Sequence, residues 1–542
     1  MKAICQTGSF EAFSMYNAIY VDKTELIYSL VSLPNRIFIS RPRRFGKSLT
    51  LDTIATLFET GVEPYFKGTW IYDKWTEPTY PVFRLSFLNL DNSSMDLFKK
   101  QLNSKITEFA NKISVKGYVE KTEPEDSILS LLEKLEEETR QIVILIDEYD
   151  YQLTSNINND ELYKQFQQKI KRIYANIKDK FAIKFLGITG VTRLKDVSIF
   201  SVGSDIRDIT NSSAYSQMIG FTRDEIKKYY IDHLKLAASY ENNCIVDNVT
   251  EAQIESLLDR LAKNYDGYCF DEFYKKKVFS TWSVNSFFQS IVENKFVFFD
   301  EYWYDNGGLP SILVNYLKTH ELNIFEYLDK DKFLKVSSDD FKNPTALTTI
   351  NQNVLMCQTG YLTLRSDLKK SSTVLLGIPN GEIYKALNRL LANNIFKGKA
   401  DVTDDQGKNL LEEGTVDDII NLFNSALNSV SYDNYPIVSE SSVQNMLKLY
   451  LLGAHQEVLS EVHEAKGRAD LIVNTDIRRI VFEFKYAQNE SEAKTKLSEA
   501  VEQIKSRDYG NILPKKHELL RIAAVFNADP KVRAFTENQI VP

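Results

Sequence analysis

Four runs of apolar, β-prone residues occur in the first part of the chain, and segments of helical periodicity separate them. The runs are RIFIS (36–40), PVFRLSFL (81–88), QIVILID (141–147) and FAIKFLGIT (181–189). In the segment EDSILSLLEKLEEE, the apolar residues that share one helix face are Ile128, Leu131, Leu132 and Leu135. Continuous apolar strands that alternate with helices are typical of a parallel sheet covered on both faces. The pattern therefore predicts an α/β domain over residues 1–215.

The next part of the chain, residues 216–385, is predicted to be mostly helical. It begins with GFTRDEIKKYY, in which Thr222 and Glu225 have the spacing of a capping box. The segment is rich in aromatic residues and contains few recognisable catalytic groupings. We therefore expect a helical middle region here.

A polar stretch, GKADVTDDQGKNLLEEG (398–414), precedes the last unit of the chain. In that unit the pattern predicts helices at about 440–453 and 490–507, strands at 457–464, 468–474, 478–485 and 519–526, and a turn at Lys466-Gly467. This order of elements predicts a separate α/β domain, which we assign to residues 386–542.

Length and composition agree with three domains of ordinary size. The 542 residues are 43% hydrophobic and 26% charged, as in soluble globular proteins. No stretch approaches the roughly 20 apolar residues that span a bilayer. The N-terminus, MKAICQTGSFEAF, lacks the basic and apolar regions of a secretory signal. We therefore expect a cytoplasmic protein without a membrane partner.

Cysteine and histidine do not indicate a metal centre. The four cysteines lie far apart and form no C-x-x-C pair, which suits a reducing compartment and argues against structural zinc. The five histidines are scattered, and none belongs to an H-E-x-x-H arrangement.

The net charge of −8 does not indicate nucleic-acid binding, because a negative protein repels phosphate at long range. Any such binding requires local basic surface, for which KIKRIYANIKDK (169–180) and YKKKVF (274–279) are candidates. Taken alone, each of these segments is more simply interpreted as a solvated helix face.

The segment ISRPRRFGKSLT (39–50) resembles half of a phosphate-binding loop. Gly46, Lys47 and Ser48 match the end of the generic motif G-x-x-x-x-G-K-[ST], but Arg41 replaces its first glycine. A basic turn that ends in a helix cap is the alternative interpretation. In context, a strand runs into the loop and a helix begins near Lys47, so that backbone N–H groups and the helix dipole point at one place.

This arrangement suits a nucleoside triphosphate. Lys47 is expected to reach the terminal phosphates, and the hydroxyl of Ser48 is expected to ligate magnesium. Arg41, Arg43 and Arg44 can add positive charge there, although the sequence does not give their direction.

A second group of polar residues follows the strand IVILID. Its end carries Asp147, expected to hold magnesium through water, and Glu148, expected to polarise the attacking water. Two acids after an apolar strand also occur without a catalytic role. In GITGVTRLK, Thr189 sits where related ATPases place a residue that senses the γ-phosphate, and Arg193 can stabilise charge. Both of these residues can equally be ordinary strand-end residues.

The last domain carries an independent pattern, D-x12-E-x-K, formed by Asp470, Glu483 and Lys485. Adjacent antiparallel strands can bring the two acids together to bind a divalent cation through oxygen ligands. Lys485 projects to the same face as Glu483 because side chains alternate along a strand. There it can position water or stabilise charge on a phosphate. The alternative is a surface salt-bridge ladder between neighbouring strands.

Further residues fit a nuclease-type site. Glu440 on the preceding helix and Glu461 on the first strand can complete an acidic cluster, which adds Glu440 to the expected metal ligands Asp470 and Glu483. Gln503 and Tyr509 lie on or near the following helix. We therefore predict that these residues form a nuclease-type site, and we make no prediction about whether the site is still active.

Several segments carry a family resemblance that covers nearly the whole chain. They are YVDKTELI (20–27), SRPRRFGKSL (40–49), LIDEYD (145–150), GFTRDEI (220–226), YDGYCF (265–270), QTGYLT (358–363) and IPNGEIY (378–384). In these segments the chain resembles bacterial AAA-ATPase-like proteins fused to a PD-(D/E)XK nuclease domain. That family carries an arginine where the generic loop has its first glycine, so Arg41 is expected.

The resemblance implies an α/β protein with three parts: a P-loop NTPase parallel sheet, a helical middle region of winged-helix type, and a C-terminal restriction-endonuclease-like domain. It also implies that ATP and Mg²⁺ are cofactors. The nuclease signature falls on Asp470, Glu483 and Lys485, with Glu440 as the helix acid and Gln503 and Tyr509 as a later motif.

The function expected from these features is an ATPase whose nucleotide state gates a magnesium-dependent nuclease. DNA is favoured over RNA as the partner, and a role in defence or mobile-element biology fits by analogy. AAA-type relatives often form rings, which makes a homo-oligomer an expectation, although no intersubunit arginine is identified. The alternative is a nucleotide-dependent switch or scaffold whose silent nuclease fold only binds nucleic acid or protein.

Overall fold

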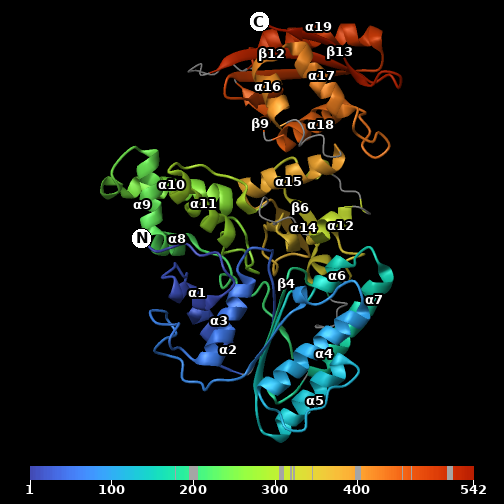
Figure 1. The fold of residues 1–542 in the computed structure, drawn as a ribbon. Helices are drawn as coiled ribbons and strands as arrows, with labels where there is room; N and C mark the ends of the chain where they lie inside the picture. The colour runs from blue at the N-terminus through green and yellow to red at the C-terminus, as the bar shows by residue number, and fades with distance from the viewer. Residues whose placement is uncertain are drawn as a thin grey trace. The chain divides into compact units, whose positions relative to one another are not determined.

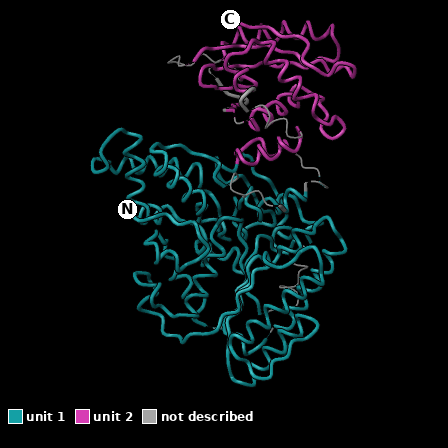
Figure 2. Tube along the Cα trace, in the orientation of Figure 1, with its two compact units in different colours: residues 1–322, 331–383 teal, residues 323–330, 384–542 magenta. Residues whose placement is uncertain are grey.

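The computed structural model describes residues 1–33, 35–177, 179–194, 205–303, 311–317, 320, 324–344, 346–396, 404–454, 456–464, 467–509 and 517–542. The chain divides into two compact units, coloured separately in Figure 2. The first unit comprises residues 1–322 and 331–383, and the second comprises residues 323–330 and 384–542. The predicted boundaries near residues 215 and 385 remain predictions.

A five-stranded parallel sheet, in the order β2-β3-β4-β1-β5, lies at the centre of the first unit. Its strands are β1 (Asn35–Ser40), β2 (Val82–Ser86), β3 (Ile142–Asp147), β4 (Ile183–Gly190) and β5 (Arg207–Asp208). The first four coincide closely with the predicted apolar runs, which confirms the parallel sheet. Because β4 lies between β1 and β3, the carboxyl ends of these three strands adjoin.

Helices cover both faces of this sheet, as expected for strands that are apolar along their whole length. Figure 1 shows α2 (Thr24–Val31) and α3 (Lys47–Thr60) on one side and α4 (Met95–Lys112), α5 (Pro124–Glu137) and α7 (Asp160–Ile177) on the other. The remaining helices of this part are α1 (Phe10–Met15) and α6 (Tyr151–Ser155).

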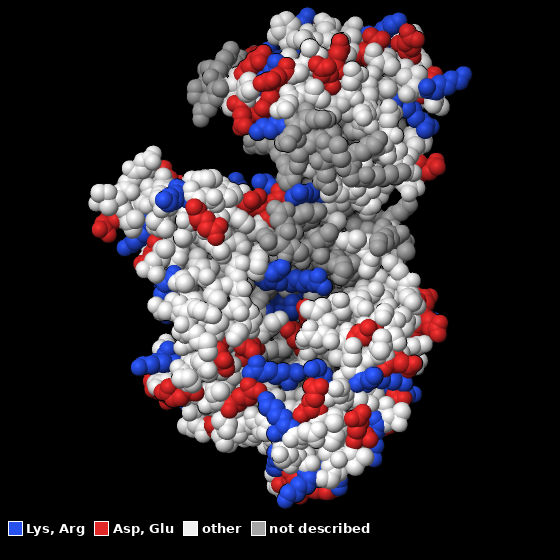
Figure 3. All heavy atoms as spheres, in the orientation of Figure 1, with Lys and Arg blue, Asp and Glu red and all other residues white. Residues whose placement is uncertain are grey.

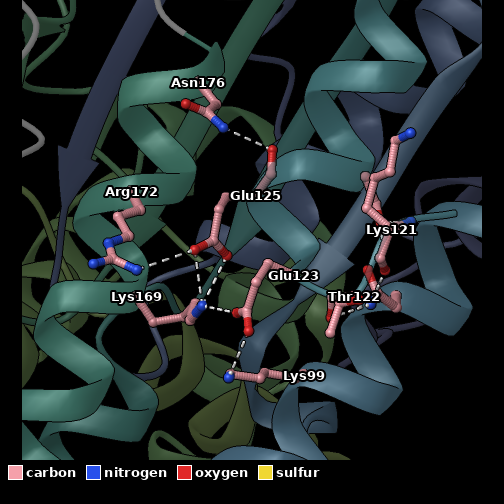
Figure 4. Close-up of polar contacts among 10 residues, drawn as sticks. Lys99, Lys121, Thr122, Glu123, Glu125, Lys169, Arg172 and Asn176 are labelled. Atoms are coloured by element: carbon pink, nitrogen blue, oxygen red, sulfur yellow. Dashed lines mark hydrogen bonds and ion pairs between the residues drawn. The ribbon is translucent and has the colours of Figure 1, made fainter.

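The basic segment 169–180 is not a free cationic surface. Lys169 is buried on α7, and its ammonium donates to both carboxylate oxygens of Glu125, at 2.8 and 2.9 Å, and also to Glu123 (Figure 4). Lys99 donates to Glu123 at 2.9 Å, and Arg172 lies 3.8 Å from Glu125. Acids on the neighbouring helix therefore offset much of the positive charge of this segment.

The middle region is mostly helical, as predicted. It contains α8 (Arg223–Tyr229), α9 (Ile231–Glu241), α10 (Glu251–Tyr265), α11 (Thr281–Asn294), α12 (Ser311–Leu317), α13 (Ser338–Lys342) and α14 (Gln352–Thr359). The predicted capping box at Thr222 and Glu225 is present at the start of α8. Leu234, Leu257 and Phe287 belong to the shared core of α8–α11 and are fully buried.

A small antiparallel sheet in this region was not predicted. Its strands, in the order β6-β8-β7, are β6 (Leu334–Ser337), β7 (Thr363–Leu364) and β8 (Thr373–Gly377). They are too short to produce a clear period-two pattern in the sequence. The winged-helix type of the middle region remains a prediction.

The second unit is built on a mixed five-stranded sheet in the order β13-β12-β11-β10-β9. Its strands are β9 (Glu457–Glu464), β10 (Gly467–Asn474), β11 (Arg478–Ala487), β12 (Glu518–Asn527) and β13 (Ala534–Ile540). The pair β11 and β12 is parallel, and the other pairs are antiparallel. Of these strands, β13 was not predicted, and Lys466 in the predicted turn lies outside the described residues.

Helices pack on both faces of the second sheet. Ala500 and Ile504 of α19 (Glu490–Arg507) share a core with Val481 of β11. On the other face, Phe423 of α17 (Val416–Leu427) lies 5.3 Å from Phe482 between ring centroids. The unit also contains α18 (Glu440–Gly453), which matches the prediction, and α16 (Asp404–Glu413). The last of these lies in the polar stretch 398–414, where no helix was predicted.

The chain passes between the two units three times, at 322/323, 330/331 and 383/384. Helix α15 (Gly381–Ile395) begins in the first unit and continues in the second. The short segment 323–330 belongs to the second unit although it lies within the sequence of the first. Its Leu328 carbonyl accepts hydrogen bonds from the Tyr384 hydroxyl at 2.9 Å and from the Lys448 ammonium at 2.8 Å.

Candidate functional sites

The loop from Arg41 to Gly46 connects the carboxyl end of β1 directly to the start of α3. Gly46 caps the helix with φ 101°, and Arg44 also has a positive φ, 69°. A side chain at Gly46 would be strained in this conformation, which accounts for the glycine in the motif. The loop thus brings the helix N-terminus, with its unpaired N–H groups, to the edge of the sheet.

Three predicted residues meet at this edge. The Ser48 hydroxyl donates to Oδ2 of Asp147 at 2.5 Å, and the Thr189 hydroxyl donates to Oδ1 of the same carboxylate. The backbone N–H of Glu148 also donates to Oδ1, at 2.9 Å. The order of strands explains this convergence, because α3 follows β1 while Asp147 and Thr189 lie at the ends of β3 and β4.

Lys47 is buried and turned back onto the loop. Its ammonium donates to the carbonyl oxygens of Arg41 and Pro42, both at 3.0 Å. Burial lowers the pKa of Lys47, and the nearby carboxylates oppose this effect. The two carbonyl contacts involve neutral acceptors, which anionic phosphate oxygens can replace with a stronger charge-assisted bond.

Glu148 is held in an unusual state. Its φ of 51° lies in the left-handed region, and within the described part of the chain its buried Oε2 has no hydrogen-bond partner. Burial raises the pKa of Glu148, and the neighbouring Asp147 carboxylate raises it further. Glu148 therefore combines a strained backbone with a carboxylate that is more basic than usual, which suits it to accept a proton from water.

A cavity of about 510 Å³ adjoins these residues. Arg43, Arg44, Lys47, Ser48 and Glu148 line it together with residues from the N-terminal segment and from the middle region. The cavity is within the size range of small-molecule sites. The cationic loop and Ser48, which line the cavity, would suit a nucleoside triphosphate, and Ser48 with its partner Asp147 would be the oxygen donors to Mg²⁺.

Several residues of this cavity were missed from the sequence. Lys23 lines it and donates to Glu225 at 2.6 Å, while Trp282 lines it and lies under the guanidinium of Arg44 at 4.0 Å. Lys23 and Glu225 belong to the segments YVDKTELI and GFTRDEI, which carried the family resemblance. Those two segments were the available signal, although neither indicated a role at the loop.

Two predicted arginines point elsewhere. Arg193 forms an ion pair with Asp208 and donates to the carbonyl of Lys342, and it is not among the residues that line the cavity. Arg41 is buried, donates to the carbonyls of Ser40 and Thr210, and also does not line the cavity. A phosphate contact by Arg193 remains a prediction that this placement does not support.

In the second unit, the pairing of β10 with β11 brings the predicted acids together. The register pairs Leu471 with Phe482, so the next residues, Asp470 and Glu483, face each other across the two strands. Oδ2 of Asp470 accepts a hydrogen bond from the backbone N–H of Phe484 at 2.9 Å. The convergence follows from the spacing of twelve residues, which two strands and a short turn span.

Lys485 joins two of the acids. Its ammonium donates to Glu483 Oε1 at 2.9 Å and to Glu440 Oε1 at 3.2 Å. Burial acts to lower the pKa of Lys485, but the carboxylates outweigh that effect, so the pKa is raised. Lys485 therefore remains an ammonium, positioned by strand β11 and by the start of α18.

Glu483 is fully buried, and its Oε2 has no hydrogen-bond partner among the residues that the structure describes. Burial and the charge of Asp470 raise the pKa of Glu483 to about 7, although Lys485 opposes them. A buried carboxylate oxygen without a partner is costly in a purely structural residue. The cluster therefore differs from a surface salt-bridge ladder, whose members would be exposed to water.

The other predicted nuclease residues are less closely tied to the cluster. The side chain of Glu461 lies outside the described part of the chain. Gln503 lies on α19 and is partly buried, and Tyr509 is fully buried, with its hydroxyl accepting a hydrogen bond from Arg507 at 2.7 Å. Gln444, which the sequence analysis missed, donates to the backbone carbonyl of Asp470. Its position four residues after Glu440, on the same face of α18, was the available signal.

The donor set of this cluster fits a divalent cation. Asp470, Glu483 and Glu440 offer hard carboxylate oxygens, and the Oε2 of Glu483 is available for a ligand. Within the described ranges, no three His, Cys, Asp or Glu side chains form a group that could hold a metal ion, so Asp470, Glu483 and Glu440 do not make a three-carboxylate site as they stand. Metal binding would therefore require water or substrate oxygens as additional ligands.

Comparisons with known proteins match two different families to the two segments that carry the candidate sites. Residues 5–200 match the family described as "Predicted AAA-ATPase", and residues 438–535 match the "PD-(D/E)XK nuclease superfamily". Two separate segments of the chain are thus similar to an AAA-ATPase-like family and to the PD-(D/E)XK nuclease superfamily. This is the combination that the sequence motifs predicted.

A relative spans nearly the whole chain. The "Uncharacterized protein in vnfD 5'region" of Azotobacter chroococcum mcd 1 is 26% identical over 527 residues, which cover 94% of this chain and 93% of the relative. Among solved structures, Cdc6p from Pyrobaculum aerophilum matches 68% of this chain and 92% of its own, with 11% identity and a TM-score of 0.22. A score this low does not establish a shared fold. Within the described residues, no helix is both long and apolar enough to cross a membrane.

Proposed function

We propose that this protein binds and hydrolyses ATP and that its nucleotide state gates a Mg²⁺-dependent nuclease that cleaves DNA. The observation that carries the nuclease part is the fully buried Glu483, which has an oxygen without a partner and lies beside Asp470 and Lys485. The ATPase part is supported by the bond between Ser48 and Asp147 at the edge of a suitably sized cavity.

At the ATP site, the chain's own residues have distinct roles in this proposal. Lys47 exchanges the carbonyls of Arg41 and Pro42 for terminal phosphate oxygens. Bound Mg²⁺ supplies charge neutralisation on the phosphates, with Ser48 and Asp147 as its donors. Glu148 accepts a proton from the attacking water, a role that its raised pKa favours. Thr189 fixes the Asp147 carboxylate through its hydroxyl.

At the nuclease site, Asp470 and Glu483 hold the metal ion, and Glu440 adds negative charge from α18. Bound Mg²⁺ supplies Lewis-acid polarisation of the scissile phosphate. The ammonium of Lys485 stabilises the negative charge that develops on the phosphate or orients the attacking water. Glu483 must be ionised for this role, so its pKa of about 7 sets the pH range of the reaction.

The partner is the least direct part of the proposal. A nuclease-superfamily domain favours nucleic acid, and we propose DNA over RNA as the substrate. On the face shown in Figure 3, acidic and basic side chains are interspersed over both units, and the net charge is −8. Binding would therefore depend on local positive charge. A cytoplasmic location, a homo-oligomer and a role in defence or mobile-element biology are extensions of the same proposal.

The decisive experiment incubates the purified full-length protein with plasmid, single-stranded DNA and RNA. Each substrate is tested with Mg²⁺ or Mn²⁺, with and without ATP. We expect metal-dependent cleavage of DNA that changes with ATP. Cleavage that is retained by Glu483→Ala would overturn the nuclease assignment. ATP binding without cleavage of any substrate would favour the alternative, a nucleotide-dependent switch whose nuclease fold only binds its partner.

A matched pair of variants controls for protein stability. Lys485→Ala removes the ammonium of the cluster, whereas Lys496→Ala removes a surface ammonium on α19 that pairs with Glu499. Only the first substitution is expected to abolish cleavage. Equal losses in both variants would indicate a general effect on folding instead.

A further inference from the structure

Every residue of the phosphate-binding loop from Arg41 to Phe45 contacts the middle region. The guanidinium groups of Arg41 and Arg44 each lie 4.0 Å from a ring centroid, that of Phe270 and that of Trp282 respectively. The centroid of the Phe45 ring lies 4.6 Å from that of Tyr268 and 5.6 Å from that of Phe270. A Cβ added to Gly360 would come within 2.8 Å of Pro42. The loop is therefore enclosed by a region outside the ATPase-like domain match.

Two backbone carbonyls of the loop are fixed by side chains of the middle region. The indole N–H of Trp303 donates to the Arg43 carbonyl at 3.1 Å, and the Thr281 hydroxyl donates to the Arg44 carbonyl at 3.0 Å. In a trans peptide the C=O and the following N–H point in opposite directions. Fixing these two carbonyls therefore fixes the directions of the N–H groups of Arg44 and Phe45.

The same contacts stabilise a strained residue. Arg44 has a φ of 69°, a left-handed conformation that costs a non-glycine residue energy and persists only when its surroundings enforce it. The donors on either side of Arg44, from Trp303 and Thr281, provide such enforcement. The loop conformation thus depends on residues more than 200 positions away in the sequence.

Trp303 is itself held by a buried carboxylate. Its backbone N–H donates to Glu382 Oε1 at 2.8 Å, while the Ser283 hydroxyl donates to Glu382 Oε2 at 2.8 Å. Trp303 is fully buried, and Glu382, in the first turn of α15, is 2% exposed. Glu382 therefore connects Trp303 with α11, the helix whose first residues Thr281 and Trp282 also contact the loop.

We propose that Trp303 and Glu382 are positioning residues of the nucleotide site, which set the loop N–H groups for phosphate binding without contacting the nucleotide. The inference rests on the proposed ATP binding and deepens it, because it assigns the phosphate affinity partly to the middle region. Removing either residue frees the Arg43–Arg44 peptide and weakens nucleotide binding.

The first test compares two tryptophan substitutions in the full-length protein. Trp303→Phe keeps most of the ring but removes the donor to Arg43, whereas Trp75→Phe removes a buried indole N–H that has no partner. Titration calorimetry with ATP should show affinity about fivefold to tenfold weaker for the first variant. The second variant should bind as the wild type does.

Unfolding by urea measures the stability of both variants, so that a change in ATP affinity can be separated from a change in folding. Unchanged affinity in Trp303→Phe, or equal changes in both variants, overturns the inference while the proposed ATP binding stands. If the wild type binds no ATP, the proposed function itself fails. Should Trp303→Phe not fold, Thr281→Val, which removes the donor to the Arg44 carbonyl, provides the same comparison.

Substitutions at Glu382 provide the second test. Glu382→Gln keeps an acceptor for the Trp303 N–H and a polar group for Ser283, so its ATP affinity should stay within about twofold of the wild type. Glu382→Ala removes both acceptors and should weaken ATP binding about tenfold. Glu125→Ala, which removes a buried carboxylate that pairs with Lys169 (Figure 4), is the matched control. A Glu382→Ala protein with wild-type affinity would overturn the inference.

Discussion

The two candidate sites each combine a lysine with carboxylates, but they use the lysine differently. Lys47 contacts two neutral backbone carbonyls, and its acid partners Asp147 and Glu148 are engaged by hydroxyl and backbone groups or left without a partner. Lys485 instead forms direct ion pairs with Glu483 and Glu440. The first site is open to an anion, whereas the lysine of the second site is already paired with two carboxylates.

The different partners of the two lysines indicate how each site would respond to its ligand. An anionic nucleotide can displace the carbonyl oxygens around Lys47 at little electrostatic cost. At the second site, a cation can approach Oε2 of Glu483, but the Lys485 ammonium occupies Oε1 and repels the incoming positive charge. We therefore expect nucleotide binding to be the more robust property and metal binding to be the more sensitive to pH and to substitution.

The largest effect is expected from Glu483→Gln, which replaces the proposed metal ligand with an isosteric amide. Cleavage should fall about a thousandfold, because metal catalysis supplies several kcal/mol of transition-state stabilisation. ATP turnover should not change. Glu499→Gln on the surface of α19 is the control, and a nuclease assay together with an ATPase assay gives the result. Loss of both activities would contradict the prediction that Glu483 acts only at the nuclease site.

A somewhat smaller effect is expected from Lys47→Ala. ATP turnover should fall about a hundredfold or more, because a charged donor to the transferring phosphate is lost. Lys67→Ala, at an exposed position of the same unit, should have wild-type turnover. If metal-dependent cleavage persists in Lys47→Ala but no longer responds to ATP, the gating part of the proposal gains support. Wild-type turnover would contradict the assignment of Lys47.

The pH dependence of cleavage separates the two sites further. Since Glu483 must be ionised and its pKa is raised to about 7, cleavage should rise about tenfold between pH 5.5 and 6.5 and level off above pH 7.5. Without metal, the same raised pKa adds stability below the ordinary pKa of a glutamate, and that contribution is lost as the pH rises through 7. A pH–rate profile without an inflection near 7 would contradict this assignment.

The smallest effect is expected from Thr189→Val, which removes the hydroxyl that donates to Asp147. Turnover should fall about tenfold, because a hydrogen bond to a charged carboxylate, worth about 1.5 kcal/mol, is lost. Thr56→Val is the control, because the Thr56 hydroxyl is buried without a partner, so its loss should not impair stability or turnover. A drop of a hundredfold or more in Thr189→Val would indicate a direct role for Thr189 at the phosphate.

Much of the fold was accessible from the sequence because burial leaves a strong pattern. The apolar run 141–147 coincides with β3, and the helix predicted at 490–507 coincides with α19. By contrast, β13 carries the mixed sequence AFTENQI and α16 lies in a charged stretch in which Leu411 is buried. Elements that bury few side chains leave too weak a periodicity to be predicted.

The residues of the candidate sites also fall into two groups, those that the sequence predicted and those that it did not. Ser48 lies at a helix start and Asp147 at a strand end, whereas Asp470 and Glu483 lie within two neighbouring strands; all four were found because each belongs to a local motif. Their supporting residues come from distant segments, and a one-dimensional pattern does not reveal such contacts. Trp303, which binds the carbonyl of Arg43 from 260 positions away, is the clearest example.

The segment 323–330 has a practical consequence for dissecting the protein. A nuclease fragment that starts at Tyr384 would lack the Leu328 carbonyl, the acceptor that both Tyr384 and Lys448 use. Such a fragment would also retain only part of α15. Adding residues 323–330 as a separate peptide should therefore restore part of the stability that the fragment loses, by fragment complementation.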